Sequence, residues 1–300
     1  MKLHMSDKYR LHMSDLQVRF GDRQVVGITE FGLGEAEIVG LAGESGSGKS
    51  MTTLAVLGLA HTVGATVRGS IQLDGTELTG LSQRALRDIR GRRIAAIFQS
   101  PAMAFSPVFK VGSVVLRALR LHGMSRADAA DAAARAMRQV LLAPDLLDRY
   151  PAQLSGGQLQ RVAIALALAL RAEVLLADEP TSALDVTVQA EVLDLLRGLR
   201  EREGMSVLLI SHDLAVVAEV CDRVAVMQGG AIVEQGPAGQ VLSAPRHEYT
   251  AELLAAVPRL GTGQTATAAP PVLSAPPAGP GGRAAGPDEE AADPDRGPAG

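Results

Sequence analysis

The chain has 300 residues, of which 47% are apolar and 21% charged, the balance of an ordinary globular protein with a substantial buried core. Its 29 basic and 33 acidic residues give a net charge of −4, which disfavours a general binder of nucleic acid or a polybasic membrane binder. The single cysteine, Cys221, excludes a disulfide framework within the chain and is best interpreted as a small buried apolar residue.

The sequence contains no stretch that could span a bilayer, which takes about 18 or more apolar residues. The most apolar run, Val162–Leu170, ends at Arg171. We therefore expect any association with a membrane to depend on a protein partner.

The first residues of the chain contain a short duplication, in which Leu3–Asp7 recurs as Leu11–Asp15. The second copy leads into Leu16–Phe20, whose alternation of polar and apolar residues is typical of a strand. We predict an extension with no assigned function over residues 1–13 and a folded domain that begins at residue 14.

Short apolar segments separated by helical patterns predict the strands of a mainly parallel α/β sheet. They are Ile38–Ala42, Ile94–Phe98, Val174–Ala177, Val207–Ile210 and Val224–Met227. Most are unbroken apolar runs, as expected for strands that are covered on both faces. The pair Gly229-Gly230 after the last of them predicts a hairpin.

Two regions differ from this pattern. Residues 100–156 lack strong strand signals, and Ser125-Arg126-Ala127-Asp128 predicts a capped, Ala-rich helix through about Leu142, so this region is predicted to be a helical insertion. Residues 259–300 hold eight of the 16 prolines, with many Ala and Gly residues. Such a composition cannot bury a core and predicts a disordered tail after a domain that ends at residue 258.

The segment Gly-Glu-Ser-Gly-Ser-Gly-Lys-Ser, between a predicted strand and the helical run Met51–Leu59, matches the phosphate-loop pattern in full. Glycines allow the backbone N–H groups to point at phosphate oxygens, and the helix start adds its dipole. Lys49 is predicted to reach the β- and γ-phosphates of ATP, and the Ser50 hydroxyl to bind Mg²⁺. The alternative, a Gly/Ser-rich turn with a chance lysine, is disfavoured by the flanking elements. The candidate nucleotide-binding residues are Gly43, Glu44, Ser45, Gly46, Ser47, Gly48, Lys49, Ser50 and Met51.

Two adjacent acidic residues end the apolar run that starts at Val174. Asp178 is expected at the carboxyl edge of the sheet, where it would hold Mg²⁺ mainly through water. If the chain turns after the strand, Glu179 can point elsewhere and polarise the attacking water as a general base. A solvated acidic turn before Pro180 is the alternative, and the complete phosphate loop disfavours it.

The pentapeptide Leu154-Ser155-Gly156-Gly157-Gln158 precedes a long apolar helix and would, alone, be interpreted as a helix-start loop capped by Ser155. Its place in a series of elements changes that interpretation. The series runs from the phosphate loop through Gln99, the pentapeptide, the acidic pair and Ser182-Ala183-Leu184-Asp185 to His212. This order resembles the nucleotide-binding subunit of ABC transporters over residues 14–258. The resemblance implies a P-loop NTPase core of the RecA-like type, an antiparallel N-terminal β subdomain and a helical subdomain at about residues 100–156.

The resemblance also implies how such subunits work. Two of them meet head to tail, and each ATP lies between one phosphate loop and the partner's Ser155, Gly156, Gly157 and Gln158. Asp185 would bridge the two subunits and His212 would touch the γ-phosphate as a catalytic residue, together with Glu179 and Lys49. Gln99 would sense the metal and the membrane partner, and Phe20 would stack on adenine.

Two of these implied functions have simpler alternatives. Phe20 could equally be a core residue, because few aromatic residues are available to the core. His212 could be a neutral histidine at the end of a strand.

Several segments resemble the branch that serves dipeptide, oligopeptide and nickel importers. They are the phosphate loop, Phe98–Pro101, Ala177–Ala190 and His247–Leu254. Two positions depart from that branch: Ser100 replaces a common Asp, and Ala36 stands where a Gly usually precedes Glu37.

The branch implies a second ATPase subunit, identical or paralogous, two membrane permeases, and indirectly an extracytoplasmic solute-binding protein. The chain would then lie on the cytoplasmic face of the cell membrane as a peripheral subunit that energises peptide uptake. Nickel or another small solute is the alternative cargo. A related ATPase that acts on nucleic acid or ribosomes is disfavoured by the single phosphate loop and the short spacing between Gln99 and Ser155. An exporter subunit is disfavoured by the absence of a spanning segment and by the importer-like run Asp185–Gln189.

Overall fold

The computed structural model describes residues 8–100, 104–182 and 184–256. The first copy of the duplication, Pro101, Ala183 and the proline-rich segment 259–300 lie outside these residues, so the predicted disordered tail stays a prediction. Within the described residues, no helix is long and apolar enough to cross a membrane.

A four-stranded antiparallel sheet forms the N-terminal part of the fold, with strand order β2-β1-β4-β5. Its strands are β1 (Leu11–Phe20), β2 (Arg23–Leu33), β4 (Thr66–Leu73) and β5 (Thr76–Glu77). This sheet matches the antiparallel subdomain that the family resemblance implied.

A six-stranded sheet forms the centre of the molecule, with strand order β10-β9-β3-β8-β7-β6. Neighbouring strands are parallel except for the β9–β10 hairpin, whose turn is at the predicted Gly229-Gly230. The strands are β3 (Ile38–Ala42), β6 (Ile94–Ile97), β7 (Val174–Asp178), β8 (Ser206–Ser211), β9 (Arg223–Gln228) and β10 (Ala231–Pro237).

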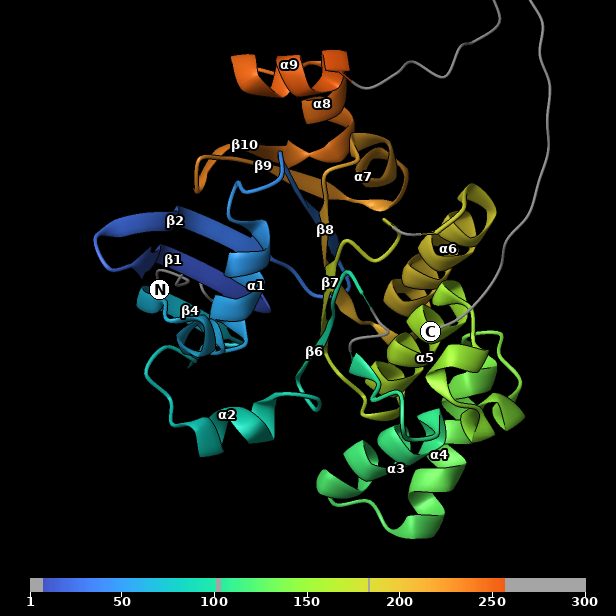
Figure 1. The fold of residues 1–300 in the computed structure, drawn as a ribbon. Helices are drawn as coiled ribbons and strands as arrows, with labels where there is room; N and C mark the ends of the chain where they lie inside the picture. The colour runs from blue at the N-terminus through green and yellow to red at the C-terminus, as the bar shows by residue number, and fades with distance from the viewer. Residues whose placement is uncertain (1–7, 101–103, 183, 257–300) are drawn as a thin grey trace, which may run out of the picture. The chain divides into compact units, whose positions relative to one another are not determined.

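The described helices lie around these two sheets (Figure 1). They are α1 (Lys49–Val56), α2 (Gln83–Ile89), α3 (Val111–Leu121), α4 (Arg126–Gln139), α5 (Gly156–Ala169), α6 (Val186–Glu203), α7 (Leu214–Val220), α8 (Ala238–Ser243) and α9 (Glu248–Ala256). Short 3₁₀ turns occur at Ala60–Val63, Pro144–Asp148 and Pro151–Gln153.

The central strands are buried on both faces, as their unbroken apolar sequences predicted. In β7, the side chains of Leu175 and Ala177 pack into one apolar cluster, and those of Val174 and Leu176 pack into another. Because successive side chains of a strand point to opposite faces, the two clusters occupy the two sides of the sheet. One cluster joins the sheet to α3–α6, and the other joins it to α1 and the antiparallel sheet.

The helical insertion forms where the sequence placed it, with a different end to its longest helix. Ser125 caps α4 by accepting a hydrogen bond from the Asp128 N–H at 3.1 Å. The helix ends at Gln139 instead of Leu142, because Leu141 has left-handed backbone with φ of 60°. In Figure 1, α3, α4 and α5 lie together on one side of the parallel sheet.

The predicted start of the folded domain at residue 14 is wrong by at least three residues. Strand β1 begins at Leu11, and the side chains of Leu11 and Met13 have no exposed surface. Leu11 pairs with Leu33 on one side and with Leu73 on the other, so it lies in the middle of the sheet. The second copy of the duplication is therefore a core strand and not part of an extension.

Cys221 lies at the C-terminal end of α7, between two apolar clusters. Burial raises the pKa of its thiol, which keeps the sulfur protonated and unreactive. This environment agrees with the interpretation of Cys221 as a buried structural residue.

Candidate functional site

The phosphate loop connects the end of β3 to the first residue of α1. Gly48, the residue before α1, has φ of 106°, and a Cβ there would lie 2.7 Å from the Val25 carbonyl oxygen. Gly43 has φ of 150°, and a Cβ there would lie 2.2 Å from the Met227 carbonyl oxygen. Side chains are therefore excluded at both ends of the loop, where the backbone passes close to strands β2 and β9.

The β9–β10 hairpin holds the loop from one side. The N–H of Gly230, at the hairpin turn, donates to the Ser47 carbonyl at 3.0 Å, and the Gly230 carbonyl accepts from the Gly27 N–H at 2.7 Å. These two backbone hydrogen bonds connect the loop to the hairpin and the hairpin to strand β2 of the antiparallel sheet. The sequence predicted the hairpin but not this contact.

Lys49 is the charged group of the loop and is 5% exposed. Its Nζ donates to the carbonyl oxygens of Gly43 and Glu44, each at 2.7 Å. Burial lowers the pKa of Lys49, and the carboxylates of Glu179, Asp178 and Glu44 act in the opposite direction. A buried ammonium surrounded by oxygens at a helix N-terminus is suited to bind an anion such as a polyphosphate.

The acidic pair separates at the end of β7, as the sequence analysis expected. Asp178 is the last residue of the strand and is 5% exposed, whereas Glu179 turns the chain with a left-handed φ of 48°. The Glu179 N–H still donates to the Ile210 carbonyl of β8 at 2.9 Å. Such a backbone conformation costs a non-glycine residue free energy, and at Glu179 it turns the chain directly after the strand.

Three predicted residues meet at the carboxyl ends of three neighbouring strands. Gln99 follows β6, Glu179 follows β7 and His212 follows β8. The Gln99 Nε2 donates to one carboxylate oxygen of Glu179 at 2.8 Å, and the His212 Nδ1 lies 2.9 Å from the other. The Glu179 carboxylate is thus oriented from both sides, an arrangement suited to a general base.

Asp178 provides a test of whether the site suits a divalent cation. Its Oδ1 atom is buried and has no hydrogen-bond partner in the structure. Burial raises the pKa of Asp178, the nearby Ser50 hydroxyl opposes that shift, and the charge of Glu179 adds to it. A buried carboxylate oxygen without a partner, next to a hydroxyl, fits a hard cation such as Mg²⁺, which takes oxygen ligands.

Most of these residues line one open pocket of about 710 Å³, whereas the buried Asp178 does not line it. Its lining includes most of the phosphate loop together with Gln99, Glu179 and His212. Phe20 and Met51 also line it, and Phe20 packs in addition against the apolar cluster that joins the central sheet to α1 and the antiparallel sheet. Val25 and Leu253 line the pocket too. The sequence analysis assigned neither to the site, because Val25 belongs to no motif and the segment His247–Leu254 indicated only the branch of the family.

The other predicted residues lie outside this pocket. Ser155 caps α5 by accepting from the Gln158 N–H at 3.2 Å, and the Gln158 side chain accepts from the Ser155 N–H at 2.9 Å. Asp185 caps α6 by accepting from the Val188 N–H at 3.0 Å. Ser155 and Asp185 are exposed to solvent. Neither Gly156 nor Gly157 lines the phosphate-loop pocket.

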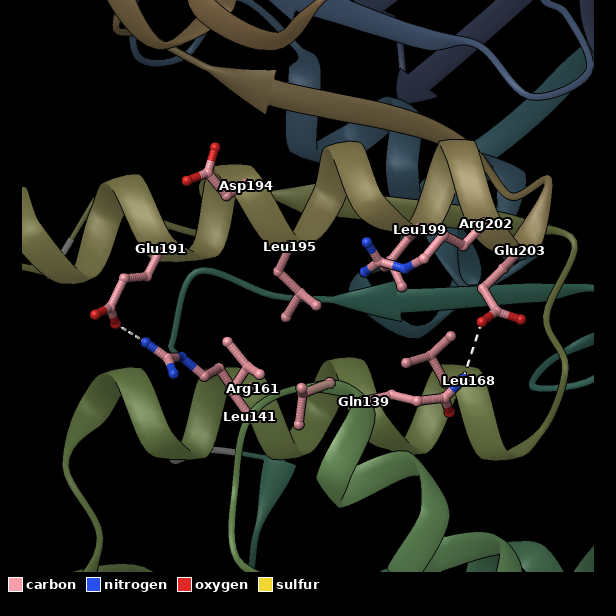
Figure 2. Close-up of a pocket in the computed structure, with 11 residues that line it drawn as sticks. Gln139, Leu141, Arg161, Leu168, Glu191, Asp194, Leu195, Leu199, Arg202 and Glu203 are labelled. Carbon is pink, nitrogen blue, oxygen red and sulfur yellow. Dashed lines mark hydrogen bonds and ion pairs between the residues drawn. The ribbon is translucent and has the colours of Figure 1, made fainter.

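The N-terminal ends of α5 and α6 pack against each other. A Cβ on Gly157 would lie 2.3 Å from Cγ1 of Val188, so only glycine fits at this contact. Further along the two helices, an ion pair between Arg161 and Glu191 connects them across a second hollow (Figure 2). The two exposed motifs are therefore held as one unit.

Figure 2 shows that this second hollow lies between α5 and α6 and is lined by side chains from these helices and the end of α4. None of the predicted site residues lines it. It has no part in the phosphate site.

Sequence comparison places these motifs in a known family. The pattern of the ABC transporter family matches residues 27–182. A dipeptide transport ATP-binding protein of Haemophilus influenzae is 40% identical over 262 residues, which are 85% of this chain and 79% of that protein. A probable peptide ABC transporter ATP-binding protein of Sinorhizobium fredii is 45% identical over 256 residues, which are 83% of this chain and 76% of that protein.

A glutathione import ATP-binding protein of Shigella dysenteriae is 47% identical over 240 residues, which are 77% of this chain and 38% of that longer protein.

Solved structures give the same result for the fold. The structure of cbiO1 from Clostridium perfringens, part of an ABC transporter complex, superposes with a TM-score of 0.69 at 25% identity over 79% of this chain and 92% of that one. A dimeric ATP-binding cassette in a post-hydrolysis state with ADP and Pi has a TM-score of 0.66 at 27% identity over 76% of this chain and 98% of that one. The predicted P-loop NTPase fold is confirmed, and the chain belongs to the ABC transporter family as an ATP-binding subunit that hydrolyses ATP.

Proposed function

We propose that this chain energises the import of peptides across the cytoplasmic membrane. The observation that supports the ATPase part is the convergence of Gln99, Glu179 and His212 beside the Lys49 pocket. The peptide cargo is inferred from the relatives, which are named for dipeptide, peptide and glutathione transport. A nickel importer is the second candidate, because the sequence resembles a branch that includes both.

In the proposed mechanism the phosphate loop binds the triphosphate, and Lys49 neutralises its charge. Ser50 and Asp178, with Gln99 nearby, would hold Mg²⁺. The metal, when bound, neutralises charge on the β- and γ-phosphate oxygens. Glu179 accepts a proton from the attacking water, while Gln99 and His212 orient its carboxylate. Each Glu179 carboxylate oxygen has one of these contacts and keeps a second lone pair that can accept the proton.

We propose further that a second ATPase subunit completes the site. The residues expected to contact the partner's nucleotide lie at the starts of α5 and α6, outside this chain's own pocket, where a facing subunit could present its nucleotide. They are Ser155, Gly156, Gly157, Gln158 and Asp185. The N-terminus of α5 offers free N–H groups and a positive dipole end to such an anion. The dimeric arrangement of the solved cassette supports this reading.

The remaining partners in the proposal are two permease subunits and, indirectly, an extracytoplasmic solute-binding protein. The chain would lie on the cytoplasmic face of the membrane and bind no nucleic acid. These assignments rest on the family relationship and not on a feature of the pocket.

Transport into proteoliposomes tests the proposal. The complete transporter, with its permeases and second ATPase subunit, is reconstituted into vesicles so that the ATPase subunits face the lumen, and ATP is enclosed in the lumen. Uptake of labelled dipeptides, glutathione and Ni²⁺ is then measured with the cognate binding protein present. We expect ATP-dependent accumulation of a peptide that is lost in Glu179→Gln. Accumulation of Ni²⁺ alone would refute the peptide cargo, and uptake that survives Glu179→Gln would refute the assigned base.

A further inference from the structure

We infer that Tyr249, in the C-terminal helix α9, is a positioning residue for the phosphate loop. Its hydroxyl oxygen accepts a hydrogen bond from the backbone N–H of Glu44 at 3.2 Å. The two residues are 205 positions apart in the sequence, so only the tertiary structure brings them together. This inference rests on the proposed role of the loop in binding nucleotide.

The peptide groups around Glu44 connect Tyr249 to the charged residue of the site. The Glu44 N–H donates to Tyr249, and the Glu44 carbonyl accepts from the Nζ of Lys49 at 2.7 Å. A residue that fixes Glu44 therefore also fixes one of the oxygens that hold the Lys49 ammonium. Loss of the hydroxyl would leave the Glu44 N–H without this partner and allow the first turn of the loop to move.

The position of the Tyr249 hydroxyl is itself well determined. The tyrosine is 6% exposed, and its ring packs in an apolar cluster that contains Ala42, the last residue before the loop. The start of α9 is held to strand β10, because the carboxylate of Glu234 accepts from the N–H groups of Arg246 and His247 at 2.9 and 3.1 Å. A ring fixed from both directions presents its hydroxyl to the loop at little cost in conformational entropy.

The same helix also reaches the pocket directly. Leu253 lies four residues after Tyr249, on the same face of α9, and lines the phosphate-loop pocket. Helix α9 is thus a wall of the nucleotide site that the phosphate-loop motif does not include. Because a loop that is already ordered binds its ligand with a smaller entropy loss, Tyr249 is expected to raise nucleotide affinity.

The test compares nucleotide affinity with stability in the full-length chain. Tyr249→Phe keeps the ring and removes the hydroxyl. We expect its affinity for ADP and ATP, measured by equilibrium titration, to fall about three- to tenfold, the factor that corresponds to one neutral hydrogen bond. The melting temperature should change little. Tyr9→Phe is the matched control, because Tyr9 stacks on His12 and does not line the pocket.

Hydrogen exchange gives a second, independent measurement. We expect the amide of Glu44 to exchange faster in Tyr249→Phe than in the wild-type chain, while amides in α4 are unchanged. If Tyr249→Phe is poorly stable, hydrogen exchange still tests the inference, because the Glu44 amide reports on the loop directly.

A third variant separates this inference from the proposed function. If Lys49→Ala loses nucleotide affinity while Tyr249→Phe binds as tightly as wild type and its Glu44 amide exchanges at the wild-type rate, the inference is overturned and the proposed site stands. Lower stability of Tyr249→Phe with unchanged affinity would likewise overturn it, since Tyr249 would then be only a structural residue. If Lys49→Ala binds nucleotide normally, the proposed site itself is wrong.

Discussion

The motifs of this family occupy two regions of the molecule: the phosphate-loop pocket, here called the first corner, and the starts of α5 and α6, here called the second corner. The two corners differ in how many of their contacts come from the chain itself. At the phosphate loop, side chains from α1 and from the ends of β6, β7 and β8 converge on one pocket. At the starts of α5 and α6, the side chains of Ser155 and Asp185 make, among the residues that the structure describes, only the local hydrogen bonds of helix caps. The first corner is assembled within the chain, whereas Ser155 and Asp185 of the second corner are exposed.

The difference shows that hydrogen bonds and contacts within one chain can identify the first corner as a site but not the second. A residue that caps its own helix looks structural, whatever else it does in an assembly. The experiments below therefore contrast residues of the two corners, and they measure single-chain binding and complex hydrolysis separately.

The largest effect is expected from Glu179→Gln. The amide cannot accept the proton of the attacking water, so steady-state ATP hydrolysis by the complete complex should fall about a hundredfold or more. Binding of ATP should persist, because Glu179 lies beside the phosphate pocket and supplies none of its positive charge. Hydrolysis close to the wild-type rate would show that another group is the base.

Lys49→Ala tests the first corner without any partner. Loss of the ammonium should weaken ATP binding by the single chain about tenfold or more, as measured by equilibrium titration. Arg161→Lys, in the second hollow, is a suitable control because it lies outside the pocket.

Lys49→Ala also tests how the buried charge of Lys49 affects the stability of the chain. Burial lowers the pKa of Lys49, so its charged form is less favourable in the folded chain than in the unfolded one at neutral pH. The contribution of Lys49 to stability should therefore become less unfavourable as the pH rises from its folded pKa toward its unfolded pKa. We expect the nucleotide-free Lys49→Ala chain to melt no lower than wild type at pH 7, and a clear drop in melting temperature would contradict this account.

Ser155→Ala tests the second corner, with Ser125→Ala as a matched control. Both serines cap a helix through the same type of hydrogen bond, so each change should cost about 1 kcal/mol of stability. Only Ser155→Ala should lower hydrolysis by the complete complex, and neither should change ATP affinity in the single chain. Equal hydrolysis in the two variants would mean that Ser155 is only a cap.

The smallest effect is expected at Ala36, far from the chemistry. Ala36 has left-handed backbone with φ of 48°, a conformation that glycine adopts without steric cost. Ala36→Gly should therefore raise the free energy of unfolding by about 0.5–1 kcal/mol in a denaturant titration. Ala130→Gly, at an exposed position of α4, is the matched control, and it should lower the free energy of unfolding by about 1 kcal/mol because glycine is unfavourable within a helix. Destabilisation by both would show that the turn before β3 does not strain Ala36.

Much of the fold and of the first corner was readable from the sequence because the determinants are local. Unbroken apolar runs predicted the central strands, and the spacing of glycines before Lys49 predicted the loop. The departure at Ala36 was also visible, but its left-handed conformation was not. The start of β1 was misjudged because Leu11 and Met13 become core residues only by pairing with β2 and β4.

The sequence by itself therefore determined that the chain has a phosphate loop, an acidic pair after a strand and a helical insertion, because each is specified by neighbouring residues. Only the tertiary structure decided that Gln99 and His212 both contact the Glu179 carboxylate, since the pairing of β6 with β7 and of β7 with β8 brings together strand ends that long helical segments separate in the chain. It also decided that Tyr249 reaches Glu44, because a hydrogen bond between residues so far apart depends on how the last helix packs and not on any local pattern.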